Sequence, residues 1–359
     1  MKRKLLICLF AGLATVLPAI LFGKGVAPAP QPFRSGDRVV FLGDSITHQG
    51  RWTGFVTRYY MEQFPSNAYE FINAGVGGDT ARGCLCRLHE DVTPYDPTVI
   101  VTMFGMNDLG GCLWAKEFGP KENARADAAL KRYEANLRTL AKRLKADCPH
   151  ARLVWCTPSI YDDTSTMAKP CDYNRNGIVL RRAAEVVKAF GAERGEPVID
   201  FNGPMARYNQ MRQKEDPAFT MVGPDRVHPL RPGAFFMACE FLKQQGLDPH
   251  ADDPMTPWPE TELSKLLGTR GGYEGQLRTL AAVRWYLRNQ KSIPNVDDME
   301  AVKAFGEQLK AKGAKGFFQD RVPLYIREWN PERLAAIRAK MKALDARIER
   351  LRRKTGAAK

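Results

Sequence analysis

The sequence predicts an α/β fold in which helices cover both faces of a doubly wound, parallel, five-stranded sheet. From Gly36 onward, short apolar segments alternate with helix-like segments, the pattern of parallel strands joined by crossover helices. The 359 residues suffice for one large domain with an appendage, or for two domains. A content of 44% hydrophobic and 26% charged residues is typical of a folded globular protein.

The first 29 residues have the layout of a secretory signal peptide. Lys2, Arg3 and Lys4 precede an apolar run over residues 5–22, and small residues follow. We therefore expect an exported chain, periplasmic or extracellular, cleaved between Gly23 and Pro30. An uncleaved membrane anchor is the alternative, and only then would membrane contact be expected.

Strands and helices of the α/β domain, residues 30–247, follow from local composition and periodicity. Runs rich in β-branched and aromatic residues predict strands at 38–42, 69–73, 98–104, 152–157 and 197–201. Helices are expected at 52–64, 80–90, 122–146, 174–193 and 232–245. Right-handed crossovers would place the loops that follow the strands on one edge of the sheet.

Two long loops, 108–121 and 158–173, are expected at that edge. Loops of this length in a compact domain are usually functional or disordered, and aromatic side chains argue against disorder. Trp114, Phe118 and Tyr161 are candidate substrate-binding residues that could line a pocket. Packing over the edge of the sheet explains them equally well.

Seven cysteines remain once Cys8 is removed with the signal peptide. Cys112 and Cys171 lie in the two long loops and are the best candidates for a disulfide. Cys84-Leu85-Cys86 resembles half of a metal site, but no second pair follows at a spacing suited to zinc. Structural thiols are the favoured interpretation.

The composition changes after Gly246. Residues 248–260 are rich in proline and aspartate, as in a linker, and a basic helical extension at 261–359 follows. Helices are predicted at 261–290, with a break at Gly271-Gly272, at 296–312 and at 331–354. The last has a heptad seam, which we expect to pack on neighbouring helical residues rather than form a coiled-coil dimer. These neighbours are Leu277, Leu280, Trp285 and Leu287.

The net charge of +14 suggests an acidic partner such as nucleic acid, an anionic polysaccharide or a membrane surface. Much of the excess belongs to the extension, because residues 251–359 hold 22 Lys and Arg against 14 Asp and Glu. Nucleic acid is not expected, because no reader motif is present and an exported chain rarely meets it. The sequence carries no signal for an oligomeric state.

Ser45 is the candidate nucleophile. The first strand stops at Gly43 and delivers Asp44-Ser45 at the carboxyl edge of the sheet, where ligands of open α/β sheets bind. An ordinary helix N-cap is the alternative interpretation of the same residues. Catalysis would require a general base and donors for an oxyanion.

Asp225 and His228 are the candidate partners of that serine. They lie three residues apart in a loop before the closing helix. His228 could accept the proton of Ser45 while Asp225 fixes the imidazole tautomer and stabilises the imidazolium. A free hydroxyl is a weak nucleophile, so such activation is needed.

Candidate oxyanion donors follow the second and third strands. The glycine-rich turn at 75–78 can present the backbone N–H of Gly78, and Asn107 can present its side-chain amide. A glycine-rich turn before a helix could instead bind phosphate. Neither a Walker lysine nor a clean dinucleotide fingerprint is present, which disfavours that alternative.

These four blocks, in this order over roughly residues 36–246, resemble the SGNH hydrolase superfamily, also called GDSL esterases and lipases. The resemblance implies a flavodoxin-like sheet, no metal and no organic cofactor. It also implies that Ser45, Asp225 and His228 are catalytic, and that Ser45, Gly78 and Asn107 form the oxyanion hole. Nothing after residue 250 belongs to the pattern.

The expected function is an exported serine esterase that removes a small acyl group, most simply acetyl, from a small-molecule or glycan ester through an acyl-enzyme. A lipase, thioesterase or lysophospholipase on the same triad is the first alternative. From a different class, the basic extension could make the chain a non-catalytic protein that binds an anionic glycan.

Overall fold

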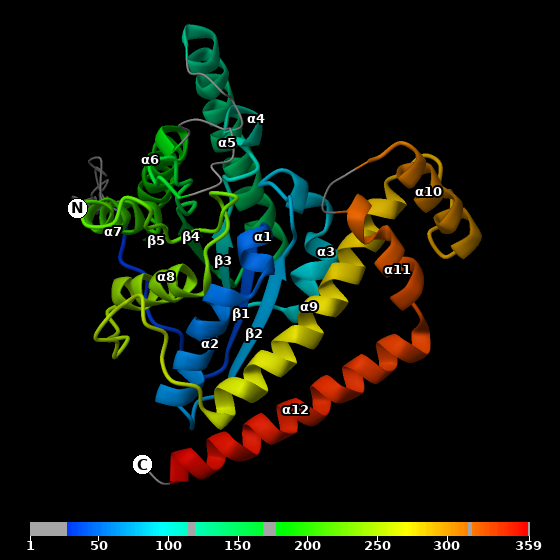
Figure 1. The fold of residues 1–359 in the computed structure, drawn as a ribbon. Coiled ribbons are helices and arrows are strands. Elements are labelled where there is room, and N and C mark those ends of the chain that lie inside the picture. The colour runs from blue at the N-terminus through cyan, green and yellow to red at the C-terminus, as the bar shows by residue number, and fades with distance from the viewer. Residues whose placement is uncertain (1–26, 114–118, 168–176, 315–317, 358–359) are drawn as a thin grey trace, which may run out of the picture.

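The described residues of this computed structural model are 27–113, 119–167, 177–314 and 318–357. They contain one five-stranded parallel sheet of order β2-β1-β3-β4-β5 (Figure 1), which confirms the predicted fold class. The strands are β1 (Asp37–Gly43), β2 (Tyr69–Gly75), β3 (Val99–Met103), β4 (Arg152–Cys156) and β5 (Val198–Ile199).

The register of the sheet makes three strands end at the same level. Gly43 of β1 lies opposite Gly75 of β2 on one side and opposite Met103 of β3 on the other. Strands β1 and β3 are buried along nearly their whole length, as expected for parallel strands covered on both faces. The segments that follow β1, β2 and β3 therefore start side by side.

Helices cover the two faces of the sheet in pairs. Helices α2 (Arg51–Gln63) and α8 (Arg231–Gln244) pack together on one face. Helices α5 (Pro120–Asp147) and α6 (Gly177–Arg194) pack together on the other (Figure 1). The predicted helices at these four places are confirmed.

The single helix predicted at 80–90 is wrong. This segment folds as three short pieces, η1 (Gly83–Cys86), α3 (Leu88–Asp91) and η2 (Thr93–Tyr95). Arg87 between the first two has a non-helical backbone, and its side chain turns inward to donate to the carbonyls of Ala74 and Gly43. The hydrogen bonds of the buried guanidinium thus hold the backbone of Arg87 in a conformation that a continuous helix would not allow.

Helix α7 (Asn202–Gln213) was not predicted. It starts with Asn-Gly-Pro, which is typical of a turn. Its buried residues are Asn202, Met205 and Asn209, so it has no regular apolar stripe that periodicity could detect.

The C-terminal extension, described at residues 261–314 and 318–357, is helical, as predicted. Its helices are α9 (Glu262–Arg288), α10 (Met299–Ala311), α11 (Val322–Glu328) and α12 (Pro331–Ala357), with a short turn η3 (Gln319–Arg321) before α11. Of these, α11 was not among the three helices predicted there. The predicted break at Gly271-Gly272 is wrong, because α9 is continuous. A glycine costs about 1 kcal/mol in a helix, and packing at both ends of α9 outweighs that cost.

Helix α12 packs along α9 (Figure 1), in partial agreement with the predicted neighbours. Leu334 at its start lies in one apolar cluster with Leu280 and Leu287, whereas Ile348 near its end lies with Leu263 and Leu266 in another. Trp285, also expected there, contacts Phe318 instead. The two helices therefore run antiparallel, with contacts reaching the start of α9.

Other predictions concern residues that are only partly described. Cys112 is a free thiol, and its expected partner Cys171 lies outside the described residues. Residues 1–26 of the expected signal peptide also lie outside them. Within the described part of the chain, each helix is too short or too polar to cross a membrane.

The close approach of β2 to the segment after β1 requires a glycine at position 75. A Cβ on Gly75 would overlap the backbone N of His48 and lie 2.7 Å from the carbonyl carbon of Thr47. We expect Gly75→Ala to lower the free energy of unfolding by about 1–3 kcal/mol in urea denaturation.

Gly54→Ala is the matched control, because Gly54 lies on the exposed side of α2 and a Cβ added there would have no neighbouring atom within 4 Å. Alanine there should be neutral or stabilise the helix by up to about 1 kcal/mol. Equal stabilities of the two variants would contradict the steric argument.

Candidate active site

Ser45 lies at the start of the short helix α1 (Ser45–His48), two residues after β1 ends. The N-cap is Asp44, whose Oδ1 accepts a hydrogen bond of 3.0 Å from the N–H of Ile46. Asp44 therefore caps α1, which is the alternative role considered for this stretch. The hydroxyl of Ser45 is left for another partner.

That partner is His228. Its Nε2 lies 2.7 Å from the Oγ of Ser45, and its Nδ1 lies 2.5 Å from Oδ2 of Asp225. The other carboxylate oxygen of Asp225 accepts bonds of 3.0 Å from the N–H groups of Val227 and His228. The structure thus brings the three predicted residues into one hydrogen-bonded chain.

The environment of Asp225 keeps its carboxylate ionised. Burial alone would raise its pKa, but the hydrogen bonds from the ring and backbone of His228 and from Val227 outweigh burial and lower the pKa to about 2. An ionised carboxylate holds the proton of the imidazole on Nδ1. Nε2 can then accept the proton of Ser45.

The loop that carries Asp225 and His228 is held by the segment after β4. Arg226 adopts a left-handed backbone conformation with φ of 66° and is buried. Its Nη1 donates to the carbonyl of Ser165 over 3.0 Å, and its own carbonyl accepts from the N–H of Asp162 over 3.0 Å. Sequence reasoning missed both residues, because Arg226 occupies a position between Asp225 and His228 at which the motif specifies no side chain, and Asp162 lies far from this loop in the sequence.

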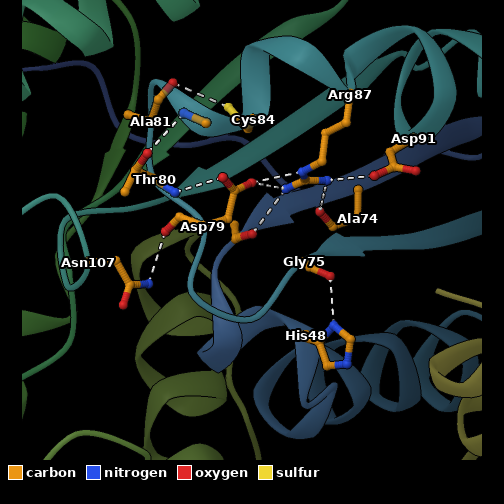
Figure 2. A network of polar contacts seen from close by, with 12 residues as sticks. His48, Ala74, Gly75, Asp79, Thr80, Ala81, Cys84, Arg87, Asp91 and Asn107 are labelled. Atoms are coloured by element: carbon orange, nitrogen blue, oxygen red, sulfur yellow. Dashed lines mark hydrogen bonds and ion pairs between the residues drawn. The ribbon is translucent and has the colours of Figure 1, made fainter. Parts of the chain in front are cut away.

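The two predicted oxyanion donors follow β2 and β3, the neighbours of β1. Gly78 has a φ of 78°, and the described residues supply no acceptor for its N–H. Asn107 donates through Nδ2 to the carbonyl of Asp79 over 2.9 Å (Figure 2). This bond uses one of its two amide hydrogens and orients the group.

Behind this edge lies a group of partly buried carboxylates that sequence reasoning did not identify. Asp79 and Asp91 pair with Arg87 at 2.7 and 2.8 Å (Figure 2). Asp108 accepts bonds of 3.1 Å from the N–H groups of Ala81 and Gly105. These contacts join the segments after β2 and β3, so they fix Gly78 and Asn107 relative to each other.

Burial raises the pKa of Asp44 to about 7, although the bond from Ile46 opposes the shift. Burial likewise raises the pKa of Asp108 to about 7. Each of these carboxyl groups is therefore costly to ionise in the folded protein.

The candidate substrate-binding residues are only partly described. Trp114 and Phe118 lie outside the described residues. Tyr161 is 2% exposed, so its ring belongs to the packed interior of this part of the chain. As for metals, the described residues contain no cluster of three or more His, Cys, Asp or Glu side chains suited to an ion.

Comparison with known proteins adds independent information. The family described as GDSL-like Lipase/Acylhydrolase matches residues 41–234. An acetylxylan esterase from Geobacillus stearothermophilus is 25% identical over 230 residues, which cover 60% of this chain and 96% of that protein.

Two solved structures illustrate the structural similarity. A gut microbial diltiazem-metabolizing enzyme matches with a TM-score of 0.77 at 23% identity, over 92% of this chain and 97% of that chain. This coverage takes in most of the C-terminal extension, so the shared fold includes it. The acetylxylan esterase structure from Geobacillus stearothermophilus matches with a TM-score of 0.48 at 24% identity, over 61% of this chain and 99% of that chain.

The buried carboxyl of Asp44 should make stability depend on pH. Its pKa rises from 3.8 to about 7 on folding, so the folded state binds more protons between these values. The free energy of unfolding should then fall as pH rises from about 4 to 7, by up to about 1.4 kcal/mol per pH unit for one such group. In Asp44→Asn this contribution should vanish, and urea denaturation at pH 5 and pH 8 would measure it.

Asp253→Asn is the control. The pKa of Asp253 is lowered by a hydrogen bond from the N–H of Met255, so this group is ionised at both pH values in both states. Its removal should leave the difference between pH 5 and pH 8 unchanged. The same difference in wild type and Asp44→Asn would argue against the raised pKa.

Proposed function

This chain belongs to the GDSL-like Lipase/Acylhydrolase family and is a serine esterase, a carboxylic ester hydrolase, and we propose that it removes small acyl groups, above all acetyl, from a carbohydrate. We also propose which residues carry out the reaction. Ser45 is the nucleophile, His228 the general base and Asp225 the residue that orients the base. The observation that carries the assignment is the continuous chain of bonds of 2.7 and 2.5 Å through His228.

In the first half of the proposed reaction, the Oγ of Ser45 attacks the ester carbonyl carbon as its proton passes to Nε2 of His228. The carbonyl oxygen becomes an oxyanion, which accepts hydrogen bonds from the N–H groups of Ser45 and Gly78 and from the amide of Asn107. The intermediate then expels the alcohol, which takes the proton from His228. The acyl group remains bound to Ser45.

In the second half, water replaces the alcohol. His228 takes a proton from the water as its oxygen attacks the acyl carbon, and the same donors stabilise the second oxyanion. Collapse returns the proton to Oγ of Ser45 and releases the carboxylic acid. Asp225 remains ionised throughout and stabilises the imidazolium in both halves.

The acetyl and carbohydrate parts of the proposal rest on likeness and on the loops. The relative that matches over 230 residues is an acetylxylan esterase, and aromatic side chains such as Trp114 and Phe118 could contact a sugar ring. The net charge of +14 would favour an acidic glycan. We also propose that the chain is exported, on the basis of its first 29 residues.

Ser45→Ala should lower kcat/KM for 4-nitrophenyl acetate by at least about 1,000-fold, because the acyl-enzyme can no longer form. Ser35→Ala is the matched control, since Ser35 is exposed and its hydroxyl contacts the N–H of Ala68. Its activity should equal that of the wild type. Unchanged activity of Ser45→Ala would exclude Ser45 as the nucleophile.

The choice of substrate has its own test. Acetate should be released from an acetylated glycan, and nitrophenyl esters should be hydrolysed faster as the acyl chain shortens. A clear preference for long acyl chains would instead indicate a lipase or thioesterase. Binding of an acidic glycan without hydrolysis of any ester would indicate a binding protein.

A further inference from the structure

Helix α9 of the C-terminal extension lies beside β2, the strand at the edge of the sheet (Figure 1). Its side chains contact the carboxyl end of that strand. The N–H of Asn73 donates to Oε1 of Glu274 over 3.3 Å. The carbonyl of Asn73 accepts from Nη1 of Arg278 over 2.5 Å. Two side chains of α9 thus satisfy backbone groups of an edge strand, as a neighbouring strand would.

Arg278 also reaches the helix that carries Ser45. Its Nη2 donates over 3.0 Å to the carbonyl of His48, the last residue of α1. Arg278 is only 9% exposed. Burial lowers the pKa of its guanidinium, and the charges of Glu274 and Asp91 oppose that shift without a direct ion pair among the described residues. A buried cation is costly unless hydrogen-bonded, and its bonds to the two carbonyls are strong because the donor is charged.

The next residue of α9 contacts the same helix through the ring of His48. Nε2 of His48 lies 3.1 Å from Oγ1 of Thr279, and Nδ1 lies 3.0 Å from the carbonyl of Gly75 (Figure 2). Burial, with the charge of Arg278, lowers the pKa of His48 to about 3. The carbonyl of Gly75 can only accept, so Nδ1 of the neutral ring carries the proton and Nε2 is an acceptor. The single hydroxyl proton of Thr279 is shared between Nε2 of His48 and the carbonyl of Gly275, which lies 2.7 Å from Oγ1 in the same helix.

Asn73 completes the connection. Its Nδ2 donates over 2.7 Å to the carbonyl of Thr47 in α1, and its Oδ1 accepts over 2.9 Å from the N–H of Gly75. Gly75 begins the turn that leads to Gly78. The segment with the nucleophile and the segment with an oxyanion donor are therefore joined through Asn73 and His48, both of which α9 contacts.

Apolar packing does not hold the two parts together at this place. A cavity of about 1330 Å³ lies between α9 and the α/β domain, and His48, Asn73 and Arg278 line it. Among the described residues, the apolar clusters of the extension include Met61 as their contact from the α/β domain. The relative position of α1 and β2 beside the cavity thus depends on polar contacts.

We propose that Arg278 and Thr279 are positioning residues of the esterase: from the C-terminal extension they hold α1, with Ser45, against the turn that carries Gly78. This inference rests on the proposed catalytic roles of Ser45 and Gly78. Oxyanion stabilisation depends on donors aimed to within a fraction of an ångström. Loss of the contacts made by Arg278 and Thr279 therefore slows the chemical step more than it weakens substrate binding.

The first experiment needs no substrate and therefore does not depend on the proposed function. Hydrogen exchange is measured by mass spectrometry on full-length wild type, Arg278→Met, Thr279→Val and Arg284→Met. Arg284 is the matched control on α9, because it pairs with Asp297 at 2.7 Å and lies over Trp329, within the extension. Exchange in peptides covering 43–49 and 73–80 should become at least about 5-fold faster in the first two variants and stay at wild-type rates in Arg284→Met.

The second experiment measures kcat and KM for 4-nitrophenyl acetate. Arg278→Met should lower kcat by about 10- to 100-fold, the range for a displaced catalytic group, with KM within about 2-fold of wild type. Arg278→Lys, which can replace one of the two bonds, should retain more activity, and added guanidinium ion should partly restore Arg278→Met. Thr279→Val, which deletes one hydroxyl, should lower kcat by about 5-fold and replaces Arg278→Met if that variant does not fold.

The inference would be overturned if both segments of Arg278→Met exchanged at wild-type rates, or those of Thr279→Val if Arg278→Met does not fold. A kcat equal to that of Arg284→Met would also overturn it. Failure of the proposed function gives a different result. In that case the wild type hydrolyses no ester, or Ser45→Ala remains active, whatever the exchange experiment shows. The exchange result then decides alone whether α9 holds α1 against β2.

Discussion

The proposed active site depends on the close approach of backbone segments at the carboxyl ends of β1 and β2. Gly43 and Gly75 lie opposite each other, and a Cβ on either would overlap atoms of Thr47 or His48. This proximity lets side chains cross-link the carbonyls of neighbouring segments. Arg87 does so from within the α/β domain through Gly43 and Ala74, and Arg278 does so from α9 through Asn73 and His48. Two buried arginines thus hold the main chain at the ends of β1 and α1 against the end of β2.

The sequence predicted what local patterns encode. Ser45 and Asn107 each follow a recognisable buried strand, and Asp225 and His228 share one short loop, so their convergence follows from the rule that parallel strands end at one edge. The contacts that orient these groups join distant segments, such as His48 with Thr279 and Arg226 with Ser165. Such pairs leave no periodic or spaced signal. Helix α7 was missed for a related reason, because its buried residues are largely polar.

The extension is more than an appended helical domain. It meets the α/β domain through hydrogen bonds and ion pairs spread along α9, from Thr261 with Glu62 near its start to Arg288 with Glu90 near its end. Each such contact contributes only about 0.5–1.5 kcal/mol when solvated. Their directionality fixes orientation better than apolar packing would, which suits a role in geometry rather than in bulk stability.

The position of α9 along β2 also has a consequence for solubility. An uncovered edge strand offers free N–H and C=O groups to other chains, and natural sheets protect such edges. Here Glu274 and Arg278 occupy both backbone groups of Asn73. A chain shortened before residue 261 would present this edge bare, with the apolar Phe71 and Ile72 in the same strand. We expect self-association through β2 to compete with folding in such a shortened chain, because the extension covers this part of the edge in the full-length protein.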